Sequence, residues 1–137
     1  MAPRILIVED HSSVRQLLRV VLETEGYRAV EAQDGPTAVE TAESVKPDLV
    51  ILDLMMPGLD GEWVLGQLKS KPEIANTPVV VVTAKAEAVP RMRELLGEGN
   101  VFPKPFDQTE LLARISELVG PGEARSDSPW KGQTRRG

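Results

Sequence analysis

The sequence predicts an α/β fold in which a five-stranded parallel sheet carries helices on both faces, a doubly wound arrangement. Five short apolar segments rich in β-branched residues are each followed by a stretch with apolar residues at helical spacing. This strict alternation of strand and helix favours parallel strands joined by right-handed crossovers. The length of 137 residues fits a single domain of this kind.

The first two strand–helix units occupy the N-terminal third of the chain. The run from Arg4 to Val8 has the composition of a buried parallel strand. A helix with apolar residues at 3.6-residue spacing follows, and we expect Gly26 to end it. A second strand is predicted at 28–32. Its helix should stop before Pro47, because proline disfavours helical backbone in the residue that precedes it.

The remaining three units repeat this order. Strands are predicted at 48–53 and 78–83, and the second of these is almost entirely β-branched, which is typical of an interior strand. A turn-rich loop at 56–61 and a helix lie between them. A helical stretch near 90–96, a short fifth strand and a final helix opened by a capping box at 107–110 complete the set.

The composition excludes several classes of protein. With 41% hydrophobic and 27% charged residues and no run of about 18 apolar residues, we expect a globular protein without membrane insertion. The N-terminus enters a strand directly instead of a signal-peptide stretch, so we expect a cytoplasmic location. The net charge of -5 argues against nucleic acid as a direct partner. Because cysteine is absent, any metal must use oxygen or imidazole ligands.

The composition changes near residue 120. From there, glycine, proline, serine and charged residues replace the apolar periodicity as far as Gly137. Segments of this kind bury too little apolar surface to offset the entropy of ordering them. We therefore expect one folded domain at 1–120 and a disordered C-terminal tail at 121–137.

Polar residues gather where the predicted strands end. They are Glu9 and Asp10, Asp53, Thr83 and Lys104. In an open α/β sheet, ligands bind in the crevice outside the carboxyl ends of the strands. Any one of these residues alone is more often a helix cap or a loop residue. Their common position at one edge of the sheet nevertheless predicts a single site.

The chemistry of this set points to phosphoryl transfer. Three carboxylates in one crevice repel one another and need a cation between them, and oxygen ligands favour Mg²⁺. A lysine and a hydroxyl add fixed positive charge and a hydrogen-bond donor, which suits a reaction whose catalysis is mainly positioning and charge neutralisation. Aspartate can itself be the nucleophile in such a reaction.

These residues resemble the motifs of receiver domains from two-component response regulators. The matching segments are Glu9-Asp10, residues 53–61, Thr83-Ala84 and Lys104-Pro105-Phe106. They occur in the family's order, and the resemblance covers about residues 4–119. It implies a flavodoxin-like sheet with strand order 2-1-3-4-5 and five helices.

The resemblance also implies a role for each matching position. Asp53 would accept the phosphoryl group. The implied Mg²⁺ ligands are the carboxylates of Asp10 and Asp53, the backbone carbonyl of Met55 and, through a water, Glu9. The implied contacts to the phosphoryl group come from Lys104, the Thr83 hydroxyl and the Ala84 backbone N–H. The Lys104-Pro105 peptide bond would be cis.

The sequence departs from the family pattern near the fifth strand. Position 101 is valine, where many receiver domains have a Tyr or Phe that moves inward on phosphorylation, and Phe102 should point to the opposite face. The segment between Thr83 and Lys104 is one residue shorter than in most relatives, so we expect a short or displaced fourth helix. Glutamate at position 9, where relatives usually have aspartate, should still support metal binding.

Two further side chains, Trp63 and His11, are interpreted separately. Trp63 should face outward if its helix turns the apolar residues at 64, 65 and 68 to the core, so it is either a contact site or partly packed. His11 is interpreted as a loop residue and not as a phosphohistidine.

The leading hypothesis is a phosphorylation-dependent signalling switch and not a conventional enzyme. A sensor histidine kinase or phosphotransfer protein would phosphorylate Asp53, and the domain would signal through an unidentified protein partner. A phosphorylation-dependent dimer is left open. The alternative is a pseudo-receiver that binds proteins without phosphorylation, for which Val101 is the best support. A metal-dependent phosphatase fits less well, because such enzymes usually need an acid where this chain has Met55.

Overall fold

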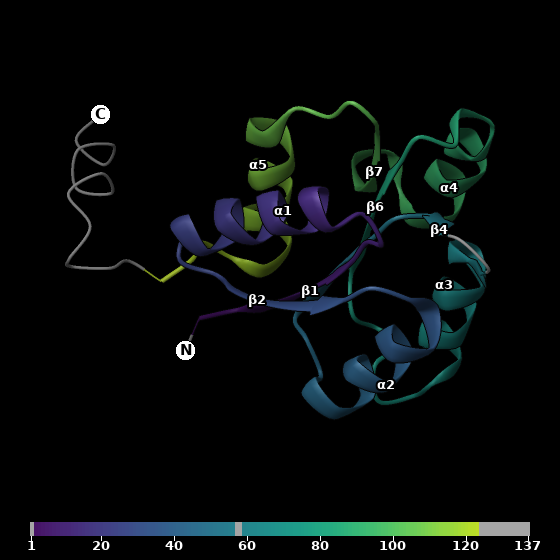
Figure 1. The fold of residues 1–137 in the computed structure, drawn as a ribbon, viewed down its shortest axis with the longest axis horizontal. Coiled ribbons are helices and arrows are strands. Elements are labelled where there is room, and N and C mark those ends of the chain that lie inside the picture. Colours follow the sequence, from purple (N-terminus) through teal and green to yellow (C-terminus); the bar gives the residue numbers. More distant parts are fainter. Residues whose placement is uncertain (1, 57–58, 124–137) are drawn as a thin grey trace.

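The structure, a computed structural model, describes residues 2–56 and 59–123. Its sheet has five parallel strands in the order β2-β1-β3-β6-β7 (Figure 1). The strands are β1 (Arg4–Val8), β2 (Arg28–Ala32), β3 (Leu49–Leu52), β6 (Val79–Thr83) and β7 (Val101–Pro103). The fold class is confirmed. The predicted order 2-1-3-4-5 also holds when only the strands of this sheet are numbered.

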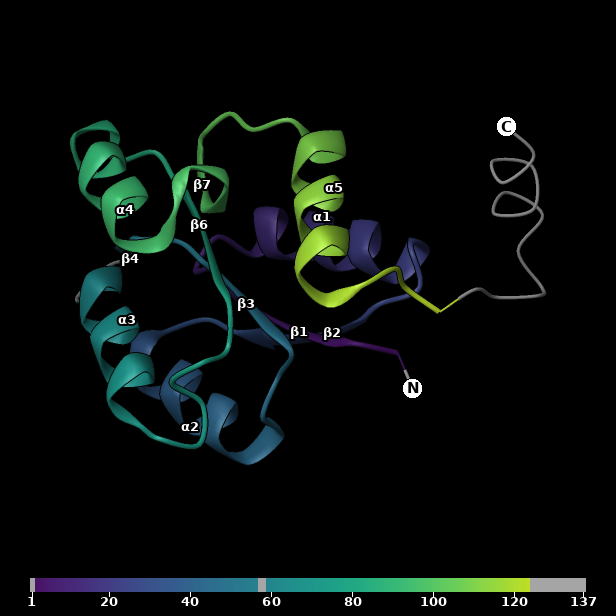
Figure 2. The same ribbon diagram turned by 180° about the vertical axis from the view of Figure 1, so that it is seen from behind.

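Helices cover both faces of the sheet, as Figures 1 and 2 show from opposite sides. One face carries α1 (Ser12–Thr24) and α5 (Gln108–Val119). The other carries α2 (Gly35–Val45), α3 (Gly61–Ser70) and α4 (Val89–Leu96). These five α-helices of the described residues are the five that the alternation predicts.

Each strand contributes alternate residues to two separate hydrophobic cores. On β1, Ile5 and Ile7 belong to the core under α1 and α5, whereas Leu6 and Val8 belong to the core under α2, α3 and α4. Because both faces of the sheet are covered, these strands have continuous apolar sequences without alternation. The same covering leaves the ends of the strands as the place where polar side chains can reach solvent.

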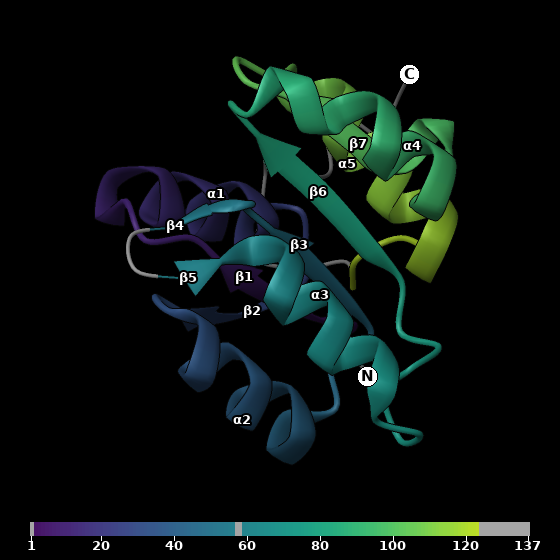
Figure 3. The same cartoon turned by 90° about the vertical axis from the view of Figure 1, so that its right-hand side faces the viewer.

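A short antiparallel ribbon follows the third strand where the sequence predicts only a turn-rich loop. In it β4 (Met55–Met56) pairs with β5 (Leu59–Asp60), and α3 begins directly afterwards (Figure 3). Segments of two residues are too short to show a strand periodicity, which is why sequence patterning misses them.

The fourth helix is short, as predicted. It has eight residues, with Pro90 in its first turn, and 3₁₀ turns at Ala86–Ala88 and Glu98–Asn100 flank it. Val101 is buried in the core under α4, and Phe102 packs toward the other core, so the two side chains point to opposite faces. Trp63 on α3 is 42% exposed, which confirms its outward position.

The start of the predicted tail lies against the turn between α1 and β2. The Tyr27 hydroxyl donates to the Gly120 carbonyl at 2.8 Å, and the Glu123 N–H donates to the Gly26 carbonyl at 2.9 Å. Gly26 has φ +91°, and a Cβ there would lie 2.2 Å from the Glu123 carbonyl oxygen. The rest of the expected disordered tail, 124–137, lies outside the described residues. In the described part of the chain, no helix combines the length and apolarity that crossing a membrane requires.

Two glycines of α3 provide a matched test of the packing behind the third strand. A Cβ on Gly61 would lie 2.5 Å from the Leu54 Cα and 2.6 Å from the Asp53 carbonyl oxygen, whereas one on Gly66 would meet no atom within 4 Å. We predict that Gly61→Ala lowers the free energy of unfolding by about 1–3 kcal/mol. Gly66→Ala should raise it by roughly 0.5–1 kcal/mol, because alanine favours helix over glycine.

Urea unfolding followed by circular dichroism would measure both changes. Equal stability of the two variants would contradict the close approach of α3 to the loop after β3.

Candidate functional site

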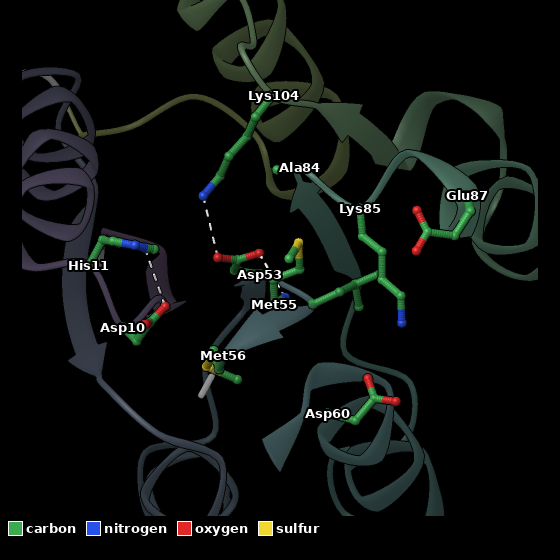
Figure 4. A pocket seen from close by; sticks show the side chains of 11 residues that line it. Asp10, His11, Asp53, Met55, Met56, Asp60, Ala84, Lys85, Glu87 and Lys104 are labelled. Atoms are coloured by element: carbon green, nitrogen blue, oxygen red, sulfur yellow. Dashed lines mark hydrogen bonds and ion pairs between the residues drawn. The ribbon is translucent and has the colours of Figure 1, made fainter. Parts of the chain in front are cut away.

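An open cavity of about 770 Å³ lies at the carboxyl ends of the strands (Figure 4). Among the residues that line it, the sequence predicts Asp10, Asp53, Met55, Ala84 and Lys104. Glu9 and Thr83 are buried just behind this surface, with 2% and 0% of their areas exposed. The structure therefore brings the predicted residues to one place.

Asp53 is buried at the end of β3, in the middle of the sheet. Its backbone N–H donates to the Val8 carbonyl at 3.0 Å, which ties it to the neighbouring strand β1. One carboxylate oxygen, Oδ1, accepts the Met55 N–H at 3.0 Å. The other, Oδ2, lies 3.3 Å from the Lys104 Nζ, as Figure 4 shows. The carboxylate is thus held by a backbone donor and a cation on opposite sides.

Lys104 joins two buried carboxylates. Its Nζ donates to the Glu9 Oε1 at 3.0 Å as well as to Asp53. The lysine reaches them because β7 ends beside β6, where the Lys104 N–H donates to the Thr83 carbonyl at 2.8 Å. The Lys104-Pro105 peptide bond that follows is cis, as the resemblance implies. One ammonium group therefore balances part of the charge of two carboxylates.

The two carboxyl groups titrate differently because their surroundings differ. Burial raises the pKa of Asp53 above its usual value, and the nearby charge of Glu9 adds to this effect against the hydrogen bond from Met55. Burial also acts on Glu9, but hydrogen bonds from Lys104 and the His11 backbone outweigh it and lower the pKa of Glu9. Of these two carboxylates, Asp53 is therefore the one whose charge the surroundings stabilise less.

Asp10 has an oxygen for which the described residues supply no hydrogen bond. Its Oδ1 is buried, and it lies 3.4 Å from the His11 Nδ1. Glu9, Asp10, His11 and Asp53 each offer a ligand atom, and these atoms lie within 4.8 Å of one another. An unsatisfied carboxylate oxygen in such a cluster fits a hard divalent cation such as Mg²⁺.

Thr83 has its hydroxyl engaged by a backbone group. The Lys85 N–H donates to the Thr83 Oγ1 at 3.0 Å, which closes a small turn at the start of the loop after β6. Ala84 between them is exposed and lines the cavity. The hydroxyl that the resemblance assigns to the phosphoryl group is therefore directed toward its own loop in this structure.

Three residues near the site have contacts that the sequence does not predict. Arg15 on α1 donates to the Glu9 carbonyl at 2.8 Å and to the Asp10 carbonyl at 3.4 Å. Glu31 on β2 accepts the Arg15 Nε at 2.8 Å and so orients the guanidinium. His11, interpreted from the sequence as a loop residue, lines the cavity beside both acidic residues. No residue pattern marks these contacts, because α1 and β2 meet only in the folded chain.

The model of the response regulator receiver domain family matches residues 5–116. The chain belongs to this family. Members of the family are signalling domains of two-component systems and not conventional enzymes, and phosphorylation and Mg²⁺ are general features of them. The acidic cluster of this receiver domain fits that chemistry.

Curated relatives and solved structures agree with this assignment. The chain is 40% identical over 120 residues to the phosphate regulon transcriptional regulatory protein PhoB of Escherichia coli K12, covering 87% of this chain and 52% of PhoB. It is 36% identical over 140 residues to the alkaline phosphatase synthesis transcriptional regulatory protein PhoP of Bacillus subtilis 168, covering 97% and 58%. The receiver domain thus spans a little over half the length of these relatives.

A solved receiver domain shows the same fold with a metal bound. The structure of the receiver domain of sensor histidine kinase PA1611 from Pseudomonas aeruginosa matches with a TM-score of 0.77 and 27% identity. The match covers 88% of this chain and 99% of that one. That structure has a magnesium ion coordinated in its active site cleft.

The opposite pKa shifts of the two buried carboxyls predict opposite effects on stability. Because the folded pKa of Asp53 is raised, the protein loses stability as pH rises from the ordinary aspartate value through the folded pKa. Without divalent ions, Asp53→Asn should therefore be more stable than the wild type above this window and lose that advantage below about pH 4.

Glu9→Gln is the matched comparison, and its expected change in stability has the opposite sign. The lowered folded pKa of Glu9 contributes stability above the ordinary glutamate value, and this stability disappears as pH falls through the folded pKa. The Gln variant should be less stable than the wild type at neutral pH. Urea unfolding between pH 3 and 7.5 would measure the stability of both variants. Stability changes of the same sign in both variants at pH 7 would contradict the opposite pKa shifts.

Proposed function

We propose that this receiver domain is a phosphorylation-dependent signalling switch whose phosphoacceptor is Asp53. The observation that carries the proposal is the position of this carboxylate, buried at the end of β3, facing the cavity and 3.3 Å from the Lys104 ammonium. Burial without full charge compensation leaves the Asp53 oxygens poorly solvated, and a poorly solvated carboxylate is a better nucleophile.

The metal site is proposed from the same cluster. Mg²⁺ would be held by the carboxylates of Asp10 and Asp53, the backbone carbonyl of Met55 and, through a water, Glu9. The buried Asp10 Oδ1, which has no hydrogen-bond partner among the described residues, supports this proposal. When bound, the ion would neutralise charge on the phosphoryl oxygens and on the acceptor.

Residues of the chain account for the rest of the transfer. An Asp53 oxygen forms the new bond to phosphorus as the bond from phosphorus to the donor's imidazole nitrogen breaks, and the donor keeps that electron pair. Lys104 pairs with one phosphoryl oxygen, and the Ala84 N–H can donate to another. The small Ala84 side chain leaves room for the group. The Thr83 hydroxyl can join only after it gives up the hydrogen bond from Lys85.

The partners follow from the chemistry that the site can accept. The donor is a phosphohistidine on a sensor histidine kinase or a phosphotransfer protein, and the output passes to a partner protein from a cytoplasmic location. Two relatives are named as transcriptional regulatory proteins, but the match covers only part of each. That this domain does not bind nucleic acid directly remains a prediction, as does a phosphorylation-dependent dimer.

Val101 favours one alternative, a pseudo-receiver that binds its partner without phosphorylation. The position is filled by a small side chain that is 3% exposed in the core under α4. An aromatic side chain that moves between an outer and an inner position is therefore missing from this place in β7.

We predict that acetyl phosphate with Mg²⁺ forms an acid-stable, hydroxylamine-labile acyl phosphate on the wild type and none on Asp53→Asn. A matched control is Glu87→Gln, which removes a different carboxylate that lines the same cavity and should leave the modification in place. Phosphate-affinity electrophoresis and intact-mass measurement would detect the acyl phosphate. Equal modification of wild type and Asp53→Asn would disprove the assignment.

The proposed signalling step also predicts that wild type and Asp53→Asn differ in partner binding after acetyl phosphate treatment. A partner captured by the phosphorylated protein should be lost when Asp53→Asn protein receives the same acetyl phosphate treatment. Capture that is equal for both proteins, together with no acyl phosphate on the wild type, would instead establish the pseudo-receiver.

A further inference from the structure

His11 places an imidazole nitrogen at the acidic cluster, and it is the single histidine of the sequence. Its Nδ1 lies 3.2 Å from the Glu9 Oε2 and 3.4 Å from the Asp10 Oδ1. The ring lines the cavity on the side of Asp10, as Figure 4 shows, and 66% of the side chain is exposed. The nitrogen is therefore close to two carboxylate oxygens and accessible from solvent.

The His11 nitrogen lies from each of these two oxygens at a distance that neighbouring ligands around one metal ion can have. Bonds of about 2.0–2.1 Å to nitrogen and oxygen place neighbouring ligand atoms about 3.0 Å apart at right angles and about 3.4 Å apart at tetrahedral angles. The observed distances of 3.2 and 3.4 Å lie within this range. An ion that contacts the Asp10 Oδ1 could thus also contact the His11 nitrogen, with Glu9 beside it.

The hydrogen bonds of the described residues leave the Asp10 Oδ1 available to an ion. Lys104 uses the Glu9 Oε1, so the Glu9 Oε2 remains on the side of His11. A purely structural role for His11 would explain its contacts with Glu9, since both its N–H and its Nδ1 lie 3.2 Å from that oxygen. A protonated His11 could also form an ion pair with the Asp10 Oδ1 at 3.4 Å, but this buried oxygen still accepts no hydrogen bond from any described residue. A shared metal ion would satisfy it.

We propose that His11 supplies an imidazole ligand to this site, so that it selects first-row transition ions such as Mn²⁺, Co²⁺ and Zn²⁺ over Mg²⁺. The chemical reason is that imidazole nitrogen suits these ions, whereas Mg²⁺ prefers oxygen ligands and retains its waters. This inference rests on the metal site proposed above and assigns the site an additional ligand and an ion preference.

Calorimetric titration of untagged protein with Co²⁺ and with Mg²⁺ tests the preference. His11→Phe keeps a planar ring of similar size and removes the nitrogen. We expect Co²⁺ affinity to fall by about tenfold or more, because a first-row ion loses a preferred ligand, while Mg²⁺ affinity changes by less than about twofold. Asp10→Asn should weaken the binding of both ions, and urea unfolding of each variant would show that it is folded.

Pulsed electron paramagnetic resonance of bound Mn²⁺ adds a direct readout. Nitrogen-14 modulation typical of a coordinated imidazole can come only from His11, because the sequence has no other histidine. The wild type should show this modulation and His11→Phe should lack it.

The possible results separate this inference from the proposed function. Wild-type protein that binds Mg²⁺ and Co²⁺ without nitrogen modulation, or His11→Phe that loses both affinities equally, would overturn the ligand role and leave the Mg²⁺ site intact. Wild-type protein that binds neither ion would overturn the metal site itself, and this inference with it.

Discussion

The structure depends on the enforced proximity of acidic groups at the end of a parallel sheet. Val8 of β1 pairs with Leu52 of β3, so the residues that follow them, Glu9 and Asp53, emerge side by side. In a parallel sheet this proximity cannot be relaxed by a change of side-chain rotamer alone, because the strand register fixes the backbone. The resulting repulsion has to be balanced by cations, and Lys104 provides only one charge for the two carboxylates.

Much of the surrounding structure can be understood as the response to that charge. Arg15 holds the backbone carbonyls of Glu9 and Asp10 and is itself oriented by Glu31, so α1 and β2 are tied to the loop that carries the acidic pair. On the opposite side, the β4–β5 ribbon places the Met55 N–H against Asp53. The buried carboxylates are therefore held in position without being fully neutralised, which is the condition in which a divalent ion binds most favourably.

The sequence predicts the part of this arrangement that follows from topology. Strand–helix alternation identifies the sheet, and the sheet brings Glu9, Asp53 and Lys104 to one edge, whatever the details of the loops. It cannot predict the direction of a side chain that is set by a tertiary contact. For this reason it missed the reach of Arg15 to the backbone of the acidic pair and the turn of His11 toward Asp10. The sequence pattern also did not predict the two-residue strands β4 and β5, because they are too short to have a periodicity.

The same contacts determine what a displacement of Thr83 would disturb. Its hydroxyl holds the Lys85 N–H, and the Lys85 Nζ lies 3.6 Å from the Glu62 Oε2, which also pairs with Arg91 of α4. Movement of the hydroxyl toward Asp53 would break the first of these contacts and so release the loop that precedes α4. Ion pairs that are partly open to solvent contribute little to stability, so the rearrangement of these two pairs costs little. With Val101 in place of an aromatic side chain, these polar contacts are a physical connection between the site and α4 that does not require an aromatic ring to move.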